Sequence, residues 1–433
     1  MPILAHAGLL LTWDLAAHLG VAFFWLAVAF LGLVLGSRRL SKMKAPSGAL
    51  ILAVAIAVRL LMLPVPSTLS DDIQRYLWDG KVATAGINPF LHEPNAPAVS
   101  GLRDESWERL PHRQVPTVYP PLALALFSVA AHLPAPVFAL KLLLTLFDLV
   151  TCVLLLILAR IVGLPTQRVV WYAWNPLVSL EVAGMGHVDA LGVTCMVLLV
   201  VCLSQHPKRV PGAALAAVAG VLAKLIPVVG FPVWARQSGR PLLFLSLAVG
   251  VSVMALVPVV VSTGGIPEGL VTFGIRWEFN GPLFEPLWRL ADSLDVPSAA
   301  SGLLDWLKVQ TGAHDFFNHF YPLNYPQLWA KLVLGITLLG AIAVAVLRQP
   351  PLAGMQWIFG SVILCSATVY PWYLLWILPW AALFGNRAWL LASATVILSY
   401  IPQFMEVSLF PWIYLAVWLP PFVVWTRHRW FSD

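Results

Sequence analysis

The densest group of residues that could do chemistry lies in the polar stretch 69–90, which begins with two adjacent carboxylates, Asp71 and Asp72. Ser70 or Asp71 can cap a helix that runs to about Ala85. A capped interfacial helix would account for one aspartate, because a carboxylate favours the positive end of the helix dipole. Two aspartates at one helix start, with further charges beyond them, favour a functional site instead.

Helical spacing sorts the polar side chains of this segment into two stripes, because residues three or four apart lie on one face. The stripes contain Asp71, Arg75 and Trp78, and Asp72, Tyr76 and Asp79. We expect a surface-lying helix in which Asp71 caps the start and pairs with Arg75, both of which lower its pKa. A nearby acid should raise the pKa of Asp72. Either aspartate could be a general base; this pattern favours Asp72, with Asp71 positioning the helix start or the substrate.

A second polar cluster interrupts the apolar sequence between 174 and 192, where Glu181, His187 and Asp189 occur. Glycines beside these residues are turn formers, so a turn explains the interruption as well as a site does. His187 and Asp189 could bind a metal, but two ligands without an obvious third give a weak signal. The sequence leaves a divalent metal open without favouring it.

A third cluster, residues 273–288, mixes polar side chains with Phe and Trp, namely Arg276, Glu278, Asn280 and Glu285. Aromatic faces stack on the apolar faces of sugars, while Asn and carboxylates accept hydrogen bonds from hydroxyls. A partly buried loop would have the same composition, so both interpretations stay open. Tyr373 lies at an expected helix junction, where it could contact a substrate or belong to an aromatic belt.

The composition indicates that lipid is the solvent for most of this chain. Of its 433 residues, 60% are hydrophobic and only 11% are charged, whereas a soluble domain has about 25% charged residues. The basic residues come in small groups between apolar runs. This pattern is typical of membrane orientation and not of a phosphate-binding stripe, so we expect no nucleic-acid partner.

The apolar runs predict an all-α, polytopic transmembrane bundle of about 11–13 spans, since a spanning helix needs about 20 apolar residues. The segment 119–133 is short and bounded by prolines, so we expect it to be re-entrant or interfacial. The run 211–235 is interrupted by Lys224 and Pro227 and predicts two short spans that meet near Lys224. The other expected spans are 17–36, 47–65, 136–160, 168–184, 190–204, 241–262, 326–347, 353–369, 371–385, 388–404 and 409–426.

Charge places these spans relative to the two sides of the membrane. Two long loops, 66–118 and 263–325, each hold seven acidic residues, whereas the opposite side is almost entirely basic. The positive-inside rule therefore predicts extracytoplasmic loops and a cytoplasmic C-terminus. The expected organisation is N-terminal spans, first loop with the acidic-pair helix, transmembrane core, second loop and C-terminal bundle, at 1–65, 66–118, 119–262, 263–325 and 326–433.

Charges inside the apolar runs invite functional hypotheses, because a charge at the membrane centre costs about 2.5–3.5 kcal/mol or more. Lys141 and Lys331 are expected to snorkel to the outer interface. Lys224 interrupts an apolar helix beside a proline. Non-helical backbone at membrane depth lines a cavity, so Lys224 is predicted to face one.

Several motifs, in their order along the chain, resemble the GT-C superfamily. They are DDIQRYLWDG, YPPL, KLLLTLFDL, WNPL, GHVDALG and AKLIPV. More narrowly, they are similar to the polyprenyl-phosphate-mannose-type membrane glycosyltransferases of bacteria, and more distantly to the first mannosyltransferase of the GPI-anchor pathway. The resemblance covers most of 47–290 and the PWY motif near 371. It implies inverting transfer of a hexose, mannose in these relatives, from a polyprenyl-phosphate donor to a hydroxyl acceptor on the extracytoplasmic face of the cell membrane.

Such a transfer needs a carboxylate to take the acceptor proton and cations to stabilise the departing phosphate. Asp72 or Asp71 would supply the first, and Arg59, Lys224 and Arg276 the second. The leaving group is already anionic, so no cofactor is required. Further expected substrate contacts are Arg75, Tyr76, Asp79, His187, Asp189, Glu278, Asn280 and Tyr373.

Two other classes of protein stay open at this point. A transporter or lipid flippase would also carry membrane-embedded charges, but the sequence shows no internal repeat and its polar clusters lie in outer loops. A non-catalytic assembly subunit would need neither the acidic pair nor the buried cations.

Overall fold

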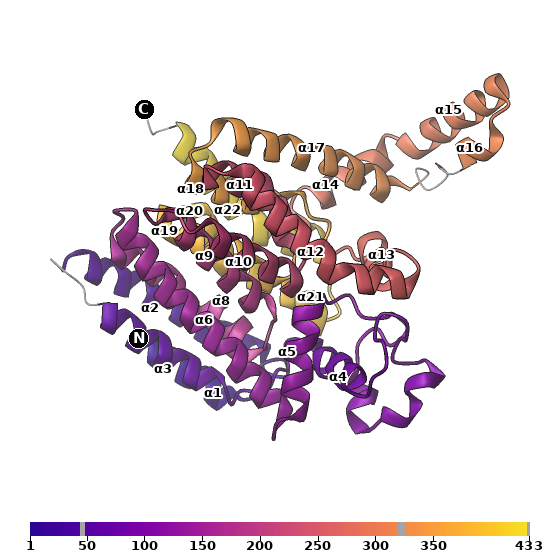
Figure 1. Ribbon diagram of the computed structural model, residues 1–433. Helices are drawn as coiled ribbons and strands as arrows, with labels where there is room; N and C mark the ends of the chain where they lie inside the picture. Colours follow the sequence, from indigo (N-terminus) through magenta and orange to yellow (C-terminus); the bar gives the residue numbers. More distant parts are fainter. Residues whose placement is uncertain (44–47, 319, 321–324, 431–433) are drawn as a thin grey trace.

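The computed structural model describes residues 1–43, 48–318, 320 and 325–430. This part of the chain is helical, and its only bridges are isolated ones from Phe279 and Asn280 to Thr368. Five of its helices are long and apolar enough to cross a membrane. This confirms a polytopic all-α bundle (Figure 1). The five are α2 (Leu19–Ser41), α6 (Pro136–Ile161), α12 (Pro241–Thr263), α17 (Pro326–Arg348) and the segment Leu409–Arg427, which contains most of α22 (Tyr414–Trp430).

Shorter apolar helices complete the bundle. They are α1 (Pro2–Thr12), α3 (Gly48–Met62), α5 (Pro121–His132), α9 (Asp189–Ser204), α10 (Val210–Ala223) and α18 (Pro351–Cys365). Near the C-terminus follow α19 (Leu378–Phe384), α20 (Arg387–Thr395) and α21 (Ile401–Phe404). The helix α1 was not predicted, because its 11 residues are too few to cross a membrane. It packs on α2, where Gly8 leaves room for the indole of Trp25.

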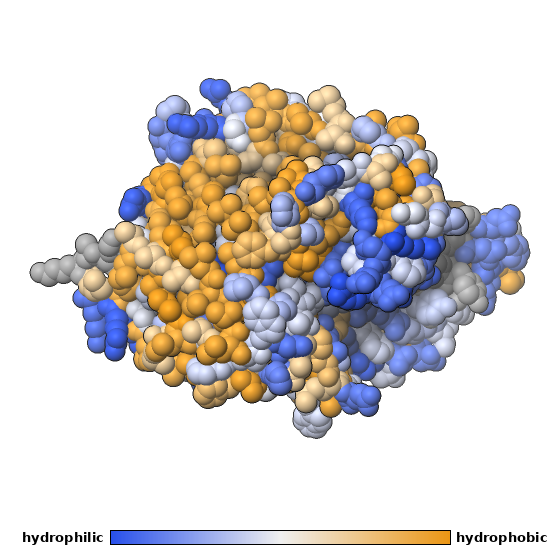
Figure 2. Space-filling model, turned by 90° about the horizontal axis from the view of Figure 1, so that it is seen from below, coloured by the Kyte–Doolittle hydropathy of each residue, from blue (hydrophilic) through white to orange (hydrophobic). Residues whose placement is uncertain are grey.

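The helices of both long loops lie at the same end of the bundle, away from the C-terminus (Figure 1). The first loop contains α4 (Asp72–Thr84). The second contains α13 (Glu268–Arg276), α14 (Phe284–Ser293), α15 (Val296–Thr311) and α16 (His314–Asn318). Seen from below, apolar residues cover much of the bundle surface and hydrophilic ones gather toward the loop end (Figure 2). On α6 the exposed apolar residues recur at helical spacing, as lipid contact requires: Leu142, Leu146, Val150, Val153 and Ile157.

The acidic-pair helix α4 is not surface-lying, contrary to the expectation. It packs against α5, where the Cα of Gly80 lies so close to the backbone of Phe127 that a Cβ would stand 2.4 Å from it. Tyr76 and Trp78 are also buried, 1% and 3% exposed. Apolar and aromatic residues on more than one side of α4 favour burial, and the helix start is thereby fixed in place.

Three interruptions in the apolar helices lie near the start of α4. The first is a π-helical turn, Leu180–Gly184, which follows α8 (Pro176–Ser179) and precedes α9. The second is Lys224, whose extended backbone (φ −160°, ψ 136°) separates α10 from α11 (Phe231–Ser238) and confirms the predicted break. The third lies between α18 and the 3₁₀ helix Pro371–Trp376. Backbone that leaves the helix at such depth can point side chains into a shared cavity.

Candidate active site

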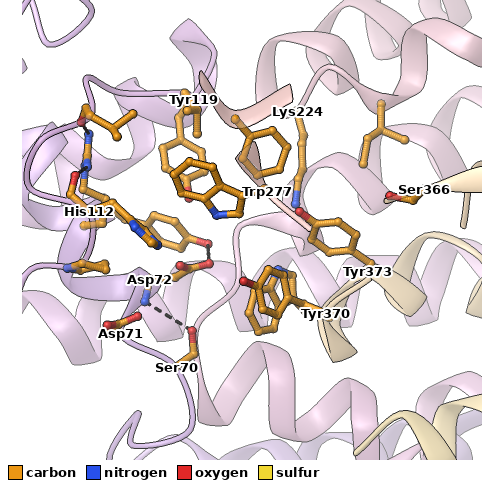
Figure 3. A pocket seen from close by; sticks show the side chains of 18 of the residues that line it. Ser70, Asp71, Asp72, His112, Tyr119, Lys224, Trp277, Ser366, Tyr370 and Tyr373 are labelled. Atoms are coloured by element: carbon orange, nitrogen blue, oxygen red, sulfur yellow. Dashed lines mark hydrogen bonds between the residues drawn. The ribbon is translucent and has the colours of Figure 1, made fainter. Parts of the chain in front are cut away.

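A cavity of about 910 Å³ opens at the loop end of the bundle. Its wall combines the start of α4, the first-loop segment before α5, the break at Lys224 and the segment that follows α18 (Figure 3). The polar and aromatic lining includes Asp71, Asp72, Arg75, Tyr76, His112, Tyr119, Lys224, Trp277, Tyr370, Trp372, Tyr373, Trp376 and Gln403. The two aspartates, Arg75, Tyr76, Lys224 and Tyr373 were all expected at the site, and the structure brings them together.

Asp72, the first residue of α4, is recessed in this cavity with 28% of its side chain exposed. The hydroxyl of Tyr76 donates to its Oδ2 at 3.3 Å. Burial raises the pKa of Asp72 to about 7, with a smaller contribution from the charge of Asp71, while the Lys224 ammonium opposes the rise. A carboxylate with such a pKa is suited to accept a proton near neutral pH.

Asp71 occupies the N-cap position of α4, but its side chain accepts no capping hydrogen bond. Instead, Ser70 Oγ accepts from the backbone N–H of Asp72 at 3.3 Å (Figure 3). The expected pairing of Asp71 with Arg75 is also wrong. Without these partners, partial burial at the cavity mouth raises the pKa of Asp71 where the sequence predicted a lowered one.

Arg75 pairs with Asp79, one turn further along α4, at 2.8 Å between Nε and Oδ1. Its other nitrogens donate to the carbonyls of His112 and Val115, at 3.2 and 2.7 Å. Asp79 is 2% exposed. The pair therefore fastens the first loop onto α4. This arrangement makes Asp79 a support of the cavity wall and not one of the residues that line it.

Lys224 and Asp189 form an ion pair at 2.6 Å between Nζ and Oδ1, although they come from different helix breaks. The same Oδ1 accepts from the indole N–H of Trp376, also at 2.6 Å. The Lys224 ammonium lies 4.7 Å from the centre of the Tyr373 ring. Asp189 is fully buried, whereas 19% of the Lys224 side chain is exposed. Lys224 thus presents a positive charge to the cavity, and its ion pair with Asp189 fixes the position of the ammonium group.

His187 lies directly behind Asp72 and is fully buried. Its Nδ1 is 3.7 Å from Asp72 Oδ2, and its Nε2 is 3.3 Å from Oε2 of the buried Glu181. The ring stacks on Trp372, with centres 3.8 Å apart and planes 13° from parallel. In the described residues, no group of three or more His, Cys, Asp or Glu is arranged to hold a metal ion.

Arg59 does not reach the cavity. Its Nε lies 2.5 Å from Asp148 Oδ2 and both side chains are fully buried. Tyr172 donates to the other oxygen of Asp148 at 2.7 Å. Lys141 was expected to snorkel, but it is 2% exposed and donates to the Val65 carbonyl at 2.5 Å. Arg59 and Lys141 thus each bind a buried group of the protein, and these contacts take the place of contact with a substrate or with water.

The polar residues of the second loop also lie apart from the cavity. Arg276 is exposed at the end of α13, although the next residue, Trp277, lines the cavity. Glu278 pairs with Lys331 at 2.8 Å. Asn280 is buried at φ 53°, and its side-chain oxygen accepts from the indole of Trp418 at 2.9 Å. The contacts of Glu278 and Asn280 thus connect the second loop to α17 and α22.

Several residues that line the cavity were not predicted from the sequence. Tyr119 belongs to the YPPL motif, and Trp372 to PWY, so a motif marked each without indicating a role. Trp277 follows a candidate directly. His112 and Gln403 carried no signal in the sequence, because the loop and helix that bring them to the cavity are distant from the other clusters.

Comparison with known proteins gives one match. The family model described as "Alpha-(1->6)-mannopyranosyltransferase, N-terminal domain" matches residues 3–238, more than half of the 433-residue chain. The matched region contains Asp71, Asp72, His187 and Lys224. No curated protein and no solved structure matches the chain.

Proposed function

Because the chain belongs to the alpha-(1->6)-mannopyranosyltransferase family, we propose that it transfers mannose from polyprenyl-phosphate mannose to an acceptor hydroxyl, with inversion, in the cavity at the loop end. Membership of this family makes the protein a multi-pass membrane hexosyltransferase and not a transporter or an assembly subunit. The basic residues at the other end of the bundle favour an extracytoplasmic position for the cavity.

One observation carries the proposal: a recessed carboxylate and a lysine ammonium line the same cavity. The acceptor oxygen attacks C1 of the mannose as the bond from C1 to the phosphate oxygen breaks. Asp72 takes the hydroxyl proton, which makes the attacking oxygen a better nucleophile. Lys224 stabilises the charge that develops on the phosphate.

A lipid-borne donor fits the remaining lining. Leu225, Ile226, Val362 and Ile363 give one side of the cavity an apolar wall. The aromatic residues Tyr119, Trp277 and Tyr373 also line the cavity and can contact a sugar with their rings. A polyprenyl chain can remain in the membrane beside the apolar wall while the mannose reaches the aromatic side.

The test uses purified protein with radiolabelled synthetic polyprenyl-phosphate mannose and a synthetic oligomannoside acceptor. Asp72→Asn keeps the shape and removes the base, so turnover should fall on the order of 10²–10⁴-fold while donor binding persists. Asp71→Asn is the matched control, one residue away, and should keep measurable turnover. If turnover is lost in Asp71→Asn but not in Asp72→Asn, Asp71 is the base instead of Asp72. Normal turnover in both variants would overturn the proposal.

A further inference from the structure

We propose that His187 positions Asp72 and, together with Glu181, takes over the proton that Asp72 removes from the acceptor hydroxyl. The inference rests on the proposed function, because it requires Asp72 to be the base. It assigns a task to two buried residues that do not line the cavity themselves.

The His187 ring lies between two carboxylates. Nδ1 faces Asp72 at 3.7 Å and Nε2 faces Glu181 at 3.3 Å, yet neither nitrogen has a hydrogen-bond partner in the described residues. Buried polar atoms are nearly always hydrogen-bonded in folded proteins, so an unpartnered pair requires an explanation. A histidine with only a packing role would have no reason to direct one nitrogen at the base and the other at a buried acid.

Neutral imidazole has one donor and one acceptor nitrogen, which fits this arrangement. With the hydrogen on Nε2, directed at Glu181, the lone pair of Nδ1 points toward Asp72. When the acceptor oxygen bonds to C1, its proton moves to Asp72 and the electron pair of the broken bond leaves with the phosphate. In the same step this proton passes on to Nδ1 while the hydrogen on Nε2 moves to Glu181, so the Asp72 carboxylate is restored, the imidazole stays neutral and Glu181 holds the extra proton. The extra proton returns through His187 and Asp72 to water when the products leave.

A column of stacked rings fixes the plane of His187. Trp372 stacks on His187, Tyr370 stacks on Trp372 at 4.6 Å and 1°, and Phe279 of the second loop stacks on Tyr370 at 4.8 Å and 21°. Four aromatic rings therefore connect the second loop to the group behind Asp72. The column prevents the imidazole from turning away, as a positioning residue requires.

Glu181 is held just as firmly. The Tyr400 hydroxyl lies 2.9 and 3.0 Å from its two oxygens. The charge of Lys224 also acts on His187, but Lys224 is paired with Asp189. The carboxylates of Asp72 and Glu181 are thus the groups that face the two imidazole nitrogens, and they provide the path for the proton.

The decisive experiment compares His187→Phe with wild type by kcat, donor KM and rate in mixtures of H₂O and D₂O. Phe retains a ring to stack on Trp372 and removes both nitrogens. We expect kcat to fall on the order of 10²-fold with donor KM unchanged. The rate against D₂O fraction should be curved in wild type, because more than one proton moves in the same step, and linear in the variant, where only the transfer to Asp72 remains. Glu181→Gln, which keeps its hydrogen bond with Tyr400, should also make the plot linear.

His112→Phe is the matched control, since His112 is likewise a histidine beside a tryptophan, Trp277, with ring centres 4.6 Å apart, but it lines the cavity itself. The plot of rate against D₂O fraction for His112→Phe should stay curved, even if the substitution changes KM. A normal kcat in His187→Phe, or an unchanged curved plot in it or in Glu181→Gln, would overturn the inference. Asp72→Asn in the same assay separates the two proposals: activity there contradicts Asp72 as base, whereas an inactive Asp72→Asn beside a normal His187→Phe contradicts only the relay.

Discussion

The dependence of activity on pH gives the sharpest test of Asp72. A base must be ionised to accept a proton, so activity should rise with pH through the pKa of Asp72 and level off above it. Burial, with the charge of Asp71, raises that pKa to about 7. The acid side of the profile should therefore lie near neutral pH and not near 4, where an ordinary aspartate titrates.

The magnitude follows from the fraction of ionised carboxyl. With a pKa of about 7, kcat/KM should be about one tenth of its plateau at pH 6 and about one hundredth at pH 5, since each pH unit is a factor of ten. An aspartate of ordinary pKa would give almost no change over this range. Asp71→Asn removes the negative charge beside Asp72 and should move the rise to lower pH. The movement should be partial, because burial is the larger cause.

The assay measures kcat/KM from pH 5 to 9, because this quantity reports the ionisation of the free enzyme. His112 lines the same cavity, and burial lowers its pKa, so it could titrate in the same window. His112→Gln is therefore measured in parallel and should keep the rise. A flat profile from pH 5 to 8, or a rise that stays in place in Asp71→Asn, would refute the assignment of Asp72.

Three more predictions test the wider arrangement. Lys224→Met should lower kcat on the order of 10²–10³-fold, as a lost charge-stabilising contact does. Arg276 lies outside the cavity, so Arg276→Met should lower kcat less in the same assay. Equal losses of kcat would contradict the placement of Lys224 at the reacting phosphate. Arg59→Met leaves the carboxylate of Asp148 buried without its ionic partner, so it should destabilise the protein by about 3–5 kcal/mol. The unfolding temperature in detergent should fall while the donor KM stays unchanged. A raised donor KM at normal stability would instead indicate that Arg59 contacts the substrate. With the natural cysteines removed, a cysteine at exposed Asn95 should react with an impermeant thiol reagent in intact cells, and one at exposed Lys208 only after permeabilisation; the reverse result would invert the orientation.

Much of the architecture could be predicted from the sequence, because lipid imposes strong local constraints. Apolar run length predicted the long helices, and Lys224 together with Pro227 predicted the break that follows α10. The π-helical turn at Glu181 was expected only as a turn. The short helix α1 was not predicted, because a helix that packs on its neighbours need not be long enough to span the bilayer alone.

The ion pairs of the site were much harder to predict from the sequence, because they depend on tertiary neighbours. Arg75 can reach acids in both directions along its helix, and spacing does not distinguish Asp71 from Asp79. Asp79 is its partner because that side of α4 is buried, which makes an unpaired Asp79 costly, whereas Asp71 lies at the cavity mouth and can be solvated. Arg59 was taken for a substrate cation for the same reason: Asp148, its partner, is 89 residues away in the sequence.

Tertiary packing also determines how the site itself is assembled. A continuous transmembrane helix satisfies its own backbone and presents side chains only sideways, so it cannot bring many polar groups to one point. Interrupted helices remove this restriction, and the ion pair of Lys224 with Asp189 and the stack of His187 on Trp372 join three such interruptions around Asp72. Each break leaves a local trace, a proline, a glycine or a charge, and so can be located in the sequence. Which breaks meet is decided by helix packing, and therefore the residues of this site could be proposed one at a time but not assembled before the fold was known.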